Sequence, residues 1–334
     1  MIRARHLKVG YNFLRGYLKK IHPYEVTAQL WNTCDSKCVY CRCPEVKTYL
    51  MSTDQWSEII RKFGNLGTLR IKFQGGEPTL RPDFRELCKE SKKAGLITAV
   101  ITNGLTVSSK PELLDYLDEL VVSLDSVRPE VNDYLRGEGS HEKATKAIDL
   151  SIQRGLRTYV NMALCQLNLP DLESMLQFCE SRGIKMNAQP IKFGVKYYDE
   201  EARKLALTPE QIRSVHLSLA NWAKQRRGVM FSRLSYSKTL SWPDLAVNSV
   251  QSDGHSKCAA GNFFVHVDPN GDIIPCIPNC SNLIPKNILK DGLTAALSHA
   301  RYHNCGDCWS AYLNERNHLY RLHPSALLGF LRRG

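Results

Sequence analysis

Residues 69–78 read Leu-Arg-Ile-Lys-Phe-Gln-Gly-Gly-Glu-Pro, a short β-rich run that ends in a pair of glycines. Similar β-rich runs recur between residues 26 and 192, and longer helical stretches separate them. This alternation predicts an α/β fold built on a parallel sheet, with functional residues at the carboxyl ends of the strands. The six predicted strands are Val26–Trp31, Leu69–Phe73, Ile97–Ile101, Leu120–Leu124, Thr158–Ala163 and Lys185–Ile191.

Capping-box patterns mark the start of three predicted helices. In such a box, a Ser or Thr side chain and a Glu or Gln three residues later satisfy the free N–H groups of the first helical turn. The three patterns are Ser52-Thr-Asp-Gln55, Ser109-Lys-Pro-Glu112 and Thr208-Pro-Glu-Gln211.

The alternation of predicted strands and helices ends near residue 228. A polar, irregular stretch follows, and then a hairpin is predicted over Phe263–Asp268 and Asp272–Pro275, with a helix near Leu293–Ala300. We therefore expect a separate C-terminal domain of β-hairpin and helix. The expected parts are a basic amphipathic helix over residues 1–25, the α/β part over 26–228 and the small domain over 229–334.

Composition places the chain among folded soluble proteins. Of its 334 residues, 43% are hydrophobic and 23% are charged, which excludes a disordered or collagen-like chain. No apolar run is long enough to cross a membrane, and the N-terminus lacks the apolar core of a signal peptide, so a cytoplasmic protein is expected. Residues 1–20 and 327–333 are amphipathic and basic, so they either pack on the protein or make a peripheral membrane contact.

The net charge of +12 is distributed unevenly. Residues 203–240 hold eight Lys and Arg residues against Glu210 alone. One interpretation is a solvated surface, and the other is attraction of an anionic substrate or of an acidic flavodoxin or ferredoxin that donates electrons. Nucleic acid is disfavoured as a partner, because the basic residues lack interleaved aromatic side chains on which bases could stack.

The chain has twelve cysteines, and eight of them fall into three tight groups. In a protein without a secretion signal, such groups indicate metal ligands more than disulfides. Cys34, Cys38 and Cys41 form a C-x3-C-x2-C pattern after the first predicted strand. Three thiolates at this spacing can hold three irons of a [4Fe–4S] cubane and leave the fourth iron open. A zinc site with Cys43 as the fourth ligand is the alternative.

The triplet resembles the signature of the radical S-adenosylmethionine (SAM) superfamily, in which an aromatic residue, here Tyr40, precedes the last cysteine. A second motif, Gly75, Gly76, Glu77 and Pro78, follows the second predicted strand and resembles the GGEP motif of the same family. The resemblance implies that this segment binds the amino group of the methionine part of SAM. Its glycines let the backbone approach a ligand closely.

Three weaker matches to the same family follow in chain order. Asn103 lies in a Thr-Asn-Gly triplet that ends the third predicted strand. Ser123 and Asp125 end the fourth strand, where similar enzymes contact SAM. Arg136 resembles an arginine that pairs with the SAM carboxylate in relatives, a bidentate task that suits a guanidinium group. Together these residues complete the predicted SAM site.

The resemblance covers about residues 26–192 and implies a partial, TIM-like (β/α)6 barrel. It also implies a radical chemistry. One electron from a reduced [4Fe–4S] cluster cleaves SAM into methionine and a 5′-deoxyadenosyl radical, which abstracts hydrogen from a substrate. The protein would position the reactants and exclude water.

The second set of cysteines resembles the opening of a SPASM domain, which carries auxiliary iron–sulfur clusters. Cys258 and Cys276 fit a C-x12-G-x4-C pattern, and Cys305 and Cys308 form a C-x2-C pair. No cysteine follows Cys308, so the shorter twitch variant fits better and implies one auxiliary [4Fe–4S] cluster on these four ligands. A zinc site on the same thiolates is the alternative. The cysteines near these groups that have no assigned role are Cys43 and Cys280.

Four cysteine ligands leave no open iron on the auxiliary cluster, which favours electron transfer or a structural role. We therefore expect a redox transformation of an unidentified small molecule in a biosynthetic pathway. The segment of about 25 residues before the barrel is too short for a separate peptide-recognition domain, which favours a small molecule or a lipid.

A maturase that modifies a peptide or a lipid is the alternative enzyme. A non-catalytic zinc-binding or nucleic-acid-binding protein is the alternative of another class. The sequence identifies no catalytic acid or base.

Overall fold

The computed structural model describes residues 23–191, 197, 199–251, 258–277, 283–303, 305–324 and 326–327. Cys280 and most of the two predicted terminal segments lie outside the described residues. The strands are β1 (Glu25–Gln29), β2 (Arg70–Gln74), β3 (Ile97–Thr102), β4 (Glu119–Ser123), β5 (Arg157–Leu164), β6 (Lys185–Pro190), β7 (Ser249–Gln251), β8 (Phe264–Val267), β9 (Asp272–Ile274), β10 (Lys286–Asn287) and β11 (Cys305–Cys308). The α-helices are α2 (Thr53–Leu66), α3 (Phe84–Lys93), α4 (Pro129–Arg136), α5 (Ser140–Gln153), α6 (Leu172–Ser181), α7 (Pro209–Gln225), α8 (Arg233–Ser237), α9 (Leu293–Ala300) and α10 (Ala311–Tyr320).

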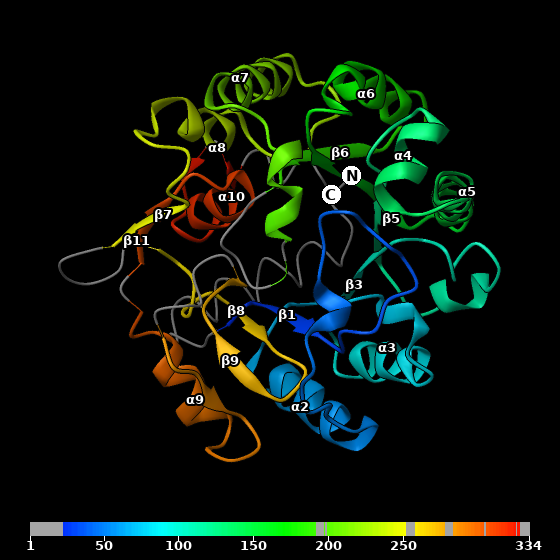
Figure 1. The fold of residues 1–334 in the computed structure, drawn as a ribbon. Helices are drawn as coiled ribbons and strands as arrows, with labels where there is room; N and C mark the ends of the chain where they lie inside the picture. The colour runs from blue at the N-terminus through cyan, green and yellow to red at the C-terminus, as the bar shows by residue number, and fades with distance from the viewer. Residues whose placement is uncertain are drawn as a thin grey trace.

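One curved sheet organises the described part of the molecule, with the strand order β10-β9-β8-β1-β2-β3-β4-β5-β6. From β1 to β6, each strand pairs in parallel with the next one along the chain. Helices α2 to α7 lie around the outside of this sheet (Figure 1). The predicted α/β partial barrel is therefore confirmed. All six predicted strands are present, with their ends shifted by no more than two residues.

The C-terminal hairpin continues the barrel sheet. Its first strand, β8, pairs in parallel with β1, and β9 returns antiparallel to β8. The hairpin was expected from its turn residues, but its place beside β1 was not, because a local pattern does not specify which strand is the partner. Further on, β11 pairs with β7 in a small separate sheet. The domain boundary near residue 228 stays a prediction.

Two of the three predicted capping boxes form. At the start of α2, the Ser52 hydroxyl accepts from the Gln55 backbone N–H at 3.2 Å, and the Ser52 N–H donates to the Gln55 side chain at 2.9 Å. The box at the start of α7 is equally complete. The prediction for Ser109 is wrong. Its hydroxyl donates to the Thr106 carbonyl at 3.1 Å instead, and a short 3-10 helix, η3 (Pro111–Leu114), follows without a side-chain cap.

The two faces of the barrel sheet differ in polarity. On the outer face, Val26 and Ala28 pack in the main apolar core together with Trp56 and Phe63 of α2. Side chains alternate along a strand, so the residues between them face the barrel interior. These interior residues include Thr27 of β1 and Lys72 of β2, which are paired in register and buried. The barrel interior is therefore polar.

Helix α10 closes the amino end of the barrel. Its Arg316 forms a buried ion pair with Glu25 of β1, and the Lys72 ammonium donates to the Tyr312 hydroxyl. The Arg316 guanidinium also lies 4.0 Å from the centre of the Tyr312 ring. Buried charges need such partners, because an unpaired charge inside a protein is costly. These contacts fix α10, and with it the cysteine strand β11 that precedes it, against the barrel.

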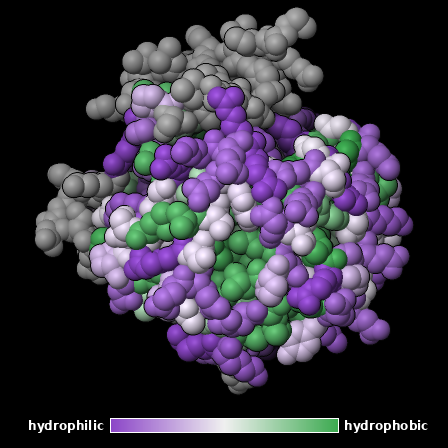
Figure 2. All heavy atoms as spheres, turned by 90° about the horizontal axis from the view of Figure 1, so that it is seen from above, coloured by the Kyte–Doolittle hydropathy of each residue, from purple (hydrophilic) through white to green (hydrophobic). Residues whose placement is uncertain are grey.

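One face of the molecule carries helices α6 and α7 (Figure 1). The side that carries α6 and α7 is mostly hydrophilic, with apolar residues gathered in one area near its middle (Figure 2). Within the described ranges, no helix combines the length and the apolar character needed to cross a membrane. The peripheral membrane contact expected of the terminal segments stays a prediction.

Candidate active site

The loop after β1 carries Cys34, Cys38 and Cys41, all half-buried and free of disulfides. Burial raises the pKa of all three thiols, that of Cys34 to about 12. Cys38 and Cys41 lie in one turn, in which the Cys41 N–H donates to the Cys38 carbonyl at 3.1 Å. Three adjacent thiols on one loop fit the predicted cluster, and binding iron as thiolates releases their protons.

The two glycines of the GGEP motif lie directly against the backbone of the cysteine loop. A Cβ on Gly75 would lie 2.3 Å from the Trp31 carbonyl oxygen, and one on Gly76 would lie 2.3 Å from those of Asn32 and Thr33. The Gly76 N–H also donates to the Trp31 carbonyl at 2.9 Å. The GGEP motif predicts that these glycines let a ligand approach the backbone. The structure adds a second reason, which is the close approach of two segments of the same chain.

The Glu77 carboxylate joins the ends of β2 and β3. It is fully buried and accepts from the Thr79 N–H at 3.0 Å, the Thr102 hydroxyl at 2.7 Å and the Asn103 N–H at 2.7 Å. The Thr79 hydroxyl, 2.5 Å away, is a fourth donor. Burial nevertheless raises the pKa of Glu77. Its side chain therefore holds the motif in place, and Pro78 starts the short 3-10 helix η2 (Pro78–Leu80) beside it.

The Asn103 side chain points back toward the cysteine loop. Its amide nitrogen donates to Asp35 Oδ1 at 2.6 Å and to Ser36 Oγ at 2.9 Å, and lies 3.9 Å from the Cys34 sulfur. Its carbonyl oxygen accepts from the Leu105 N–H at 2.9 Å. Glu77 holds the backbone of Asn103, so the three motifs form one connected unit. The predicted contact of Asn103 with SAM stays a prediction, and the visible role of Asn103 is to support the loop.

Tyr40, Asp125 and Arg136 form a buried hydrogen-bonded group. The Tyr40 hydroxyl donates to Asp125 Oδ2 at 2.5 Å, and Arg136 Nη1 lies 2.7 Å from the Tyr40 hydroxyl and 3.2 Å from Asp125 Oδ2. Burial raises the pKa of Tyr40 well above its usual range. The backbone carbonyl of Arg136 also accepts from the Lys37 N–H at 3.3 Å, so α4 supports the middle of the cysteine loop. Ser123 ends β4 opposite Asn161 of β5.

The structure also gathers the second set of cysteines. Cys258, Cys276 and Cys308 pack in one apolar cluster that is separate from the main core, and Cys305 is half-buried at the start of β11. Burial raises the pKa of Cys258. Cys43, beside the first loop, is buried with its sulfur 3.8 Å from the Asn32 side-chain oxygen.

Neither cysteine group converges on a single point. Among the described residues, no group of three or more His, Cys, Asp and Glu side chains is arranged to hold one metal ion. Zinc needs four ligands directed at one ion, whereas a cubane cluster spreads its thiolates over different irons. For both cysteine groups the cluster stays the prediction and zinc stays the alternative.

Much of the basic charge over residues 203–240 has internal partners. Arg213 donates to backbone carbonyls, with the shortest distance, 2.8 Å, to the Trp242 carbonyl oxygen. Arg227 pairs with Glu173 and Glu180, each at 2.8 Å. These contacts favour the interpretation of a solvated structural surface, and an anionic partner stays a prediction.

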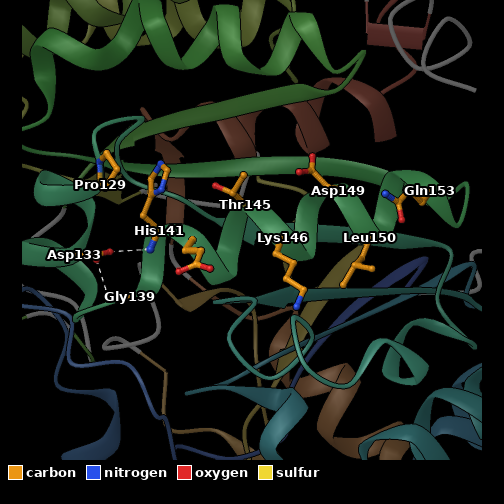
Figure 3. A pocket seen from close by; sticks show the side chains of 10 residues that line it. Pro129, Asp133, Gly139, His141, Thr145, Lys146, Asp149, Leu150 and Gln153 are labelled. Carbon is orange, nitrogen blue, oxygen red and sulfur yellow. Dashed lines mark hydrogen bonds between the residues drawn. The ribbon is translucent and has the colours of Figure 1, made fainter.

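A hollow of about 760 Å³ lies along α4 and α5 (Figure 3). On its wall, Asp133 accepts from the N–H groups of Gly139 and His141, each at 2.8 Å. These bonds order the turn between the two helices. None of the residues predicted for the SAM site lines this hollow.

Residues 29–179 match the sequence model of the radical SAM superfamily. The chain therefore carries a radical SAM domain, which implies one [4Fe–4S] cluster and SAM. The match ends before the second set of cysteines, so it does not bear on a twitch or SPASM domain.

Two curated relatives cover most of the chain. PqqA peptide cyclase of Rhizobium meliloti is 25% identical over 310 residues, which are 88% of this chain and 76% of the relative. Mycofactocin maturase MftC of Mycolicibacterium smegmatis is 27% identical over 281 residues, with coverage of 81% and 68%.

Solved structures with a similar fold include Streptococcus suis SuiB bound to S-adenosylmethionine. Its TM-score is 0.65 at 18% identity, over 87% of this chain and 70% of SuiB. The structure of anSMEcpe with bound AdoMet has a TM-score of 0.65 at 15% identity, over 92% of this chain and 98% of that one. SuiB has also been solved with its precursor peptide SuiA, with a TM-score of 0.63. These likenesses confirm the fold.

Gly76→Ala should disrupt the first cysteine site. The new methyl group would lie 2.3 Å from two carbonyl oxygens of the loop, so the loop must move. We expect the variant to lose the iron and sulfide of the first cluster, measured after anaerobic reconstitution. Gly155→Ala is the control, because Gly155 has a φ of +71° and no atom near its would-be Cβ. The control should cost stability and keep the iron. Full iron in Gly76→Ala would contradict this role.

Glu77 should make stability fall as pH rises. Burial raises the pKa of Glu77 above its ordinary value of 4.5. A carboxyl group with a raised folded-state pKa stabilises fully below its unfolded-state pKa, and this contribution is lost as pH rises through the folded-state value. Glu77→Gln removes the ionisation. The free energy of unfolding, measured with urea at a series of pH values from 4.5 upward, should therefore depend less on pH in this variant than in wild type. Equal slopes would show that Glu77 does not titrate as described.

Proposed function

We propose that this chain, whose residues 29–179 form a radical SAM domain, is an enzyme that modifies a peptide. The proposal that the chain is an enzyme rests on one observation: the cysteine loop, the GGEP segment and Asn103 form one connected unit. Support for a peptide substrate comes from the relatives, which by name are a peptide cyclase and a maturase. They favour this alternative over the small molecule that the short N-terminal segment suggested.

In this proposal Cys34, Cys38 and Cys41 hold a [4Fe–4S] cluster with one open iron. When bound and reduced, the cluster supplies one electron for cleavage of SAM to a radical that abstracts hydrogen from the peptide. The backbone of Gly75 and Gly76 keeps the loop in place. Packed side chains beside the loop, among them the buried Tyr40 and Leu135, exclude water from this region.

The SAM site would be formed by the strand ends around this loop. Arg136 and Ser123 are proposed to contact the cofactor directly, and Tyr40 and Asp125 orient Arg136 through their hydrogen bonds. Because Glu77 and Asn103 use their side chains within the protein, we assign them a positioning role. The residues proposed for the SAM site are Tyr40, Gly75, Gly76, Glu77, Pro78, Asn103, Ser123, Asp125 and Arg136.

We further propose that Cys258, Cys276, Cys305 and Cys308 hold one auxiliary [4Fe–4S] cluster of the twitch type. Support comes from the apolar cluster that contains three of these cysteines and from the strand that contains the fourth. An acidic flavodoxin or ferredoxin would supply the electron to the first cluster.

SAM cleavage tests the proposed activity. Anaerobically reconstituted protein, reduced with dithionite, should convert SAM to methionine and 5′-deoxyadenosine, and short peptides encoded beside its gene should be screened for a mass change in this reaction. Cys38→Ala should abolish cleavage, because it removes a cluster ligand. Cys88→Ala is the matched control, since Cys88 is buried in α3 among core residues. Wild-type protein that assembles iron and leaves SAM intact would refute the proposed activity.

The iron content tests the auxiliary cluster. Wild-type protein should bind about eight irons per chain, and Cys258→Ala should bind about four while still cleaving SAM. Cys179→Ala provides the control, because Cys179 is a residue of α6 that is buried in the main core. An unchanged iron content in Cys258→Ala would refute the auxiliary cluster and leave the first cluster in place.

A further inference from the structure

A buried His–Asp pair lies on the strand next to β1. His266, in β8, is only 2% exposed, and its Nε2 lies 3.0 Å from Asp268 Oδ1. Asp268 directly follows the strand and is buried as well. In the parallel pair of β8 and β1, His266 is opposite Thr27. The pair is therefore one strand away from the strand that leads into the cysteine loop.

The alternation along β8 directs His266 into the barrel. Its neighbours Val265 and Val267 belong to the main core on the outer face of the sheet. His266 faces the opposite side, in the same row as Thr27 and Lys72, since register pairs Thr27 with both of them. The imidazole ring thus belongs to the polar interior face of the barrel. Its strand, β8, flanks β1 on one side, and β2, β3 and β4 follow on the other side.

One ring nitrogen of His266 has no hydrogen-bond partner among the described residues. Within the described part of the chain, Nδ1 is buried and makes no hydrogen bond. The Asp268 carboxylate can only accept, so Nε2 carries the hydrogen between them, and in the neutral ring Nδ1 is an acceptor. Asp268 is itself held by a bond from its N–H to the Asp272 carbonyl at 2.9 Å. The ring is thus fixed with an unused acceptor in a buried polar region.

A metal ion does not account for this acceptor. No set of three or more His, Cys, Asp and Glu side chains in the described ranges is arranged around a single ion, and His266 and Asp268 are only two such groups. An unsatisfied buried acceptor costs stability unless a ligand satisfies it. The complementary ligand group is a hydrogen-bond donor.

We propose that His266 Nδ1 accepts a hydrogen bond from an N–H or O–H group of the substrate, and that Asp268 is the positioning residue that fixes the ring tautomer. The inference rests on the proposed function, because it takes this donor to belong to a peptide. A site with a buried acceptor rejects a ligand that lacks the matching donor, because the acceptor then stays unpaired. His266 thereby contributes to substrate specificity.

The test uses two small amides and reconstituted protein labelled with 15N-histidine. N-methylacetamide has the N–H donor of a peptide bond, and N,N-dimethylacetamide is a similar molecule without it. NMR should show that His266 Nδ1 carries no hydrogen, with the signal assigned through His266→Asn. N-methylacetamide should shift this signal saturably toward that of a hydrogen-bonded nitrogen, and N,N-dimethylacetamide should not. His216 is the control, because its Nδ1 already lies 2.9 Å from the Ile212 carbonyl.

Three results would overturn the proposal: a hydrogen on Nδ1 in the free protein, an equal response to both amides, or no response to either. Asp268→Asn should give a mixture of ring tautomers, and an unchanged tautomer would show that Asp268 does not position the ring. The measurement needs no radical chemistry. Failure of SAM cleavage would therefore contradict the proposed function alone, while these NMR results would still decide the role of His266.

Discussion

The candidate active site depends on one buried carboxylate, that of Glu77. Its four hydrogen bonds join the end of β2 to the end of β3, and the glycines before it press against the loop after β1. Segments that are far apart in the chain thus become one unit. A buried carboxylate is tolerated only while its donors are in place, so the unit is held together cooperatively. The cysteine loop has its shape because this unit exists.

The polar interior of the barrel is the second constraint. At the amino end, Glu25 and Lys72 find their partners on α10, so that end is closed by internal contacts. Along β8, by contrast, His266 presents an acceptor that no described residue satisfies. His266 shares its row of interior side chains with Lys72, so the acceptor proposed for the substrate lies next to the contacts of α10.

Local sequence patterns predicted the elements and the order of the motifs. Alternation of strands and helices identified β1 to β6, and the Ser52 capping box identified the start of α2, because both are determined by residues close together in the chain. The Ser109 prediction failed because a short 3-10 helix with Lys110 as its N-cap forms after Ser109, in place of an α-helix that starts at Ser109. The motifs at the ends of β2 and β3 were predicted as parts of the SAM site, and the structure places Gly76 and Asn103 against the cysteine loop.

Partnerships between distant segments could not be predicted in the same way. Asn103 faces Asp35 and Ser36, and β8 lies beside β1, through contacts that no local pattern encodes. His266 had no motif to mark it, since a single histidine in a hairpin strand is indistinguishable from a core residue. The sheet register of β8 and the buried Nδ1 without a hydrogen bond in the described structure identify it.

The central claim is that Cys34, Cys38 and Cys41 hold a cluster whose remaining iron binds SAM. Electron–nuclear double resonance tests it most directly, on reduced protein with SAM that carries 15N at its amino group. We predict hyperfine coupling between the cluster and the labelled nitrogen, and loss of this signal when any one of the three cysteines is replaced. A reduced cluster that shows no coupling to bound SAM would contradict the account.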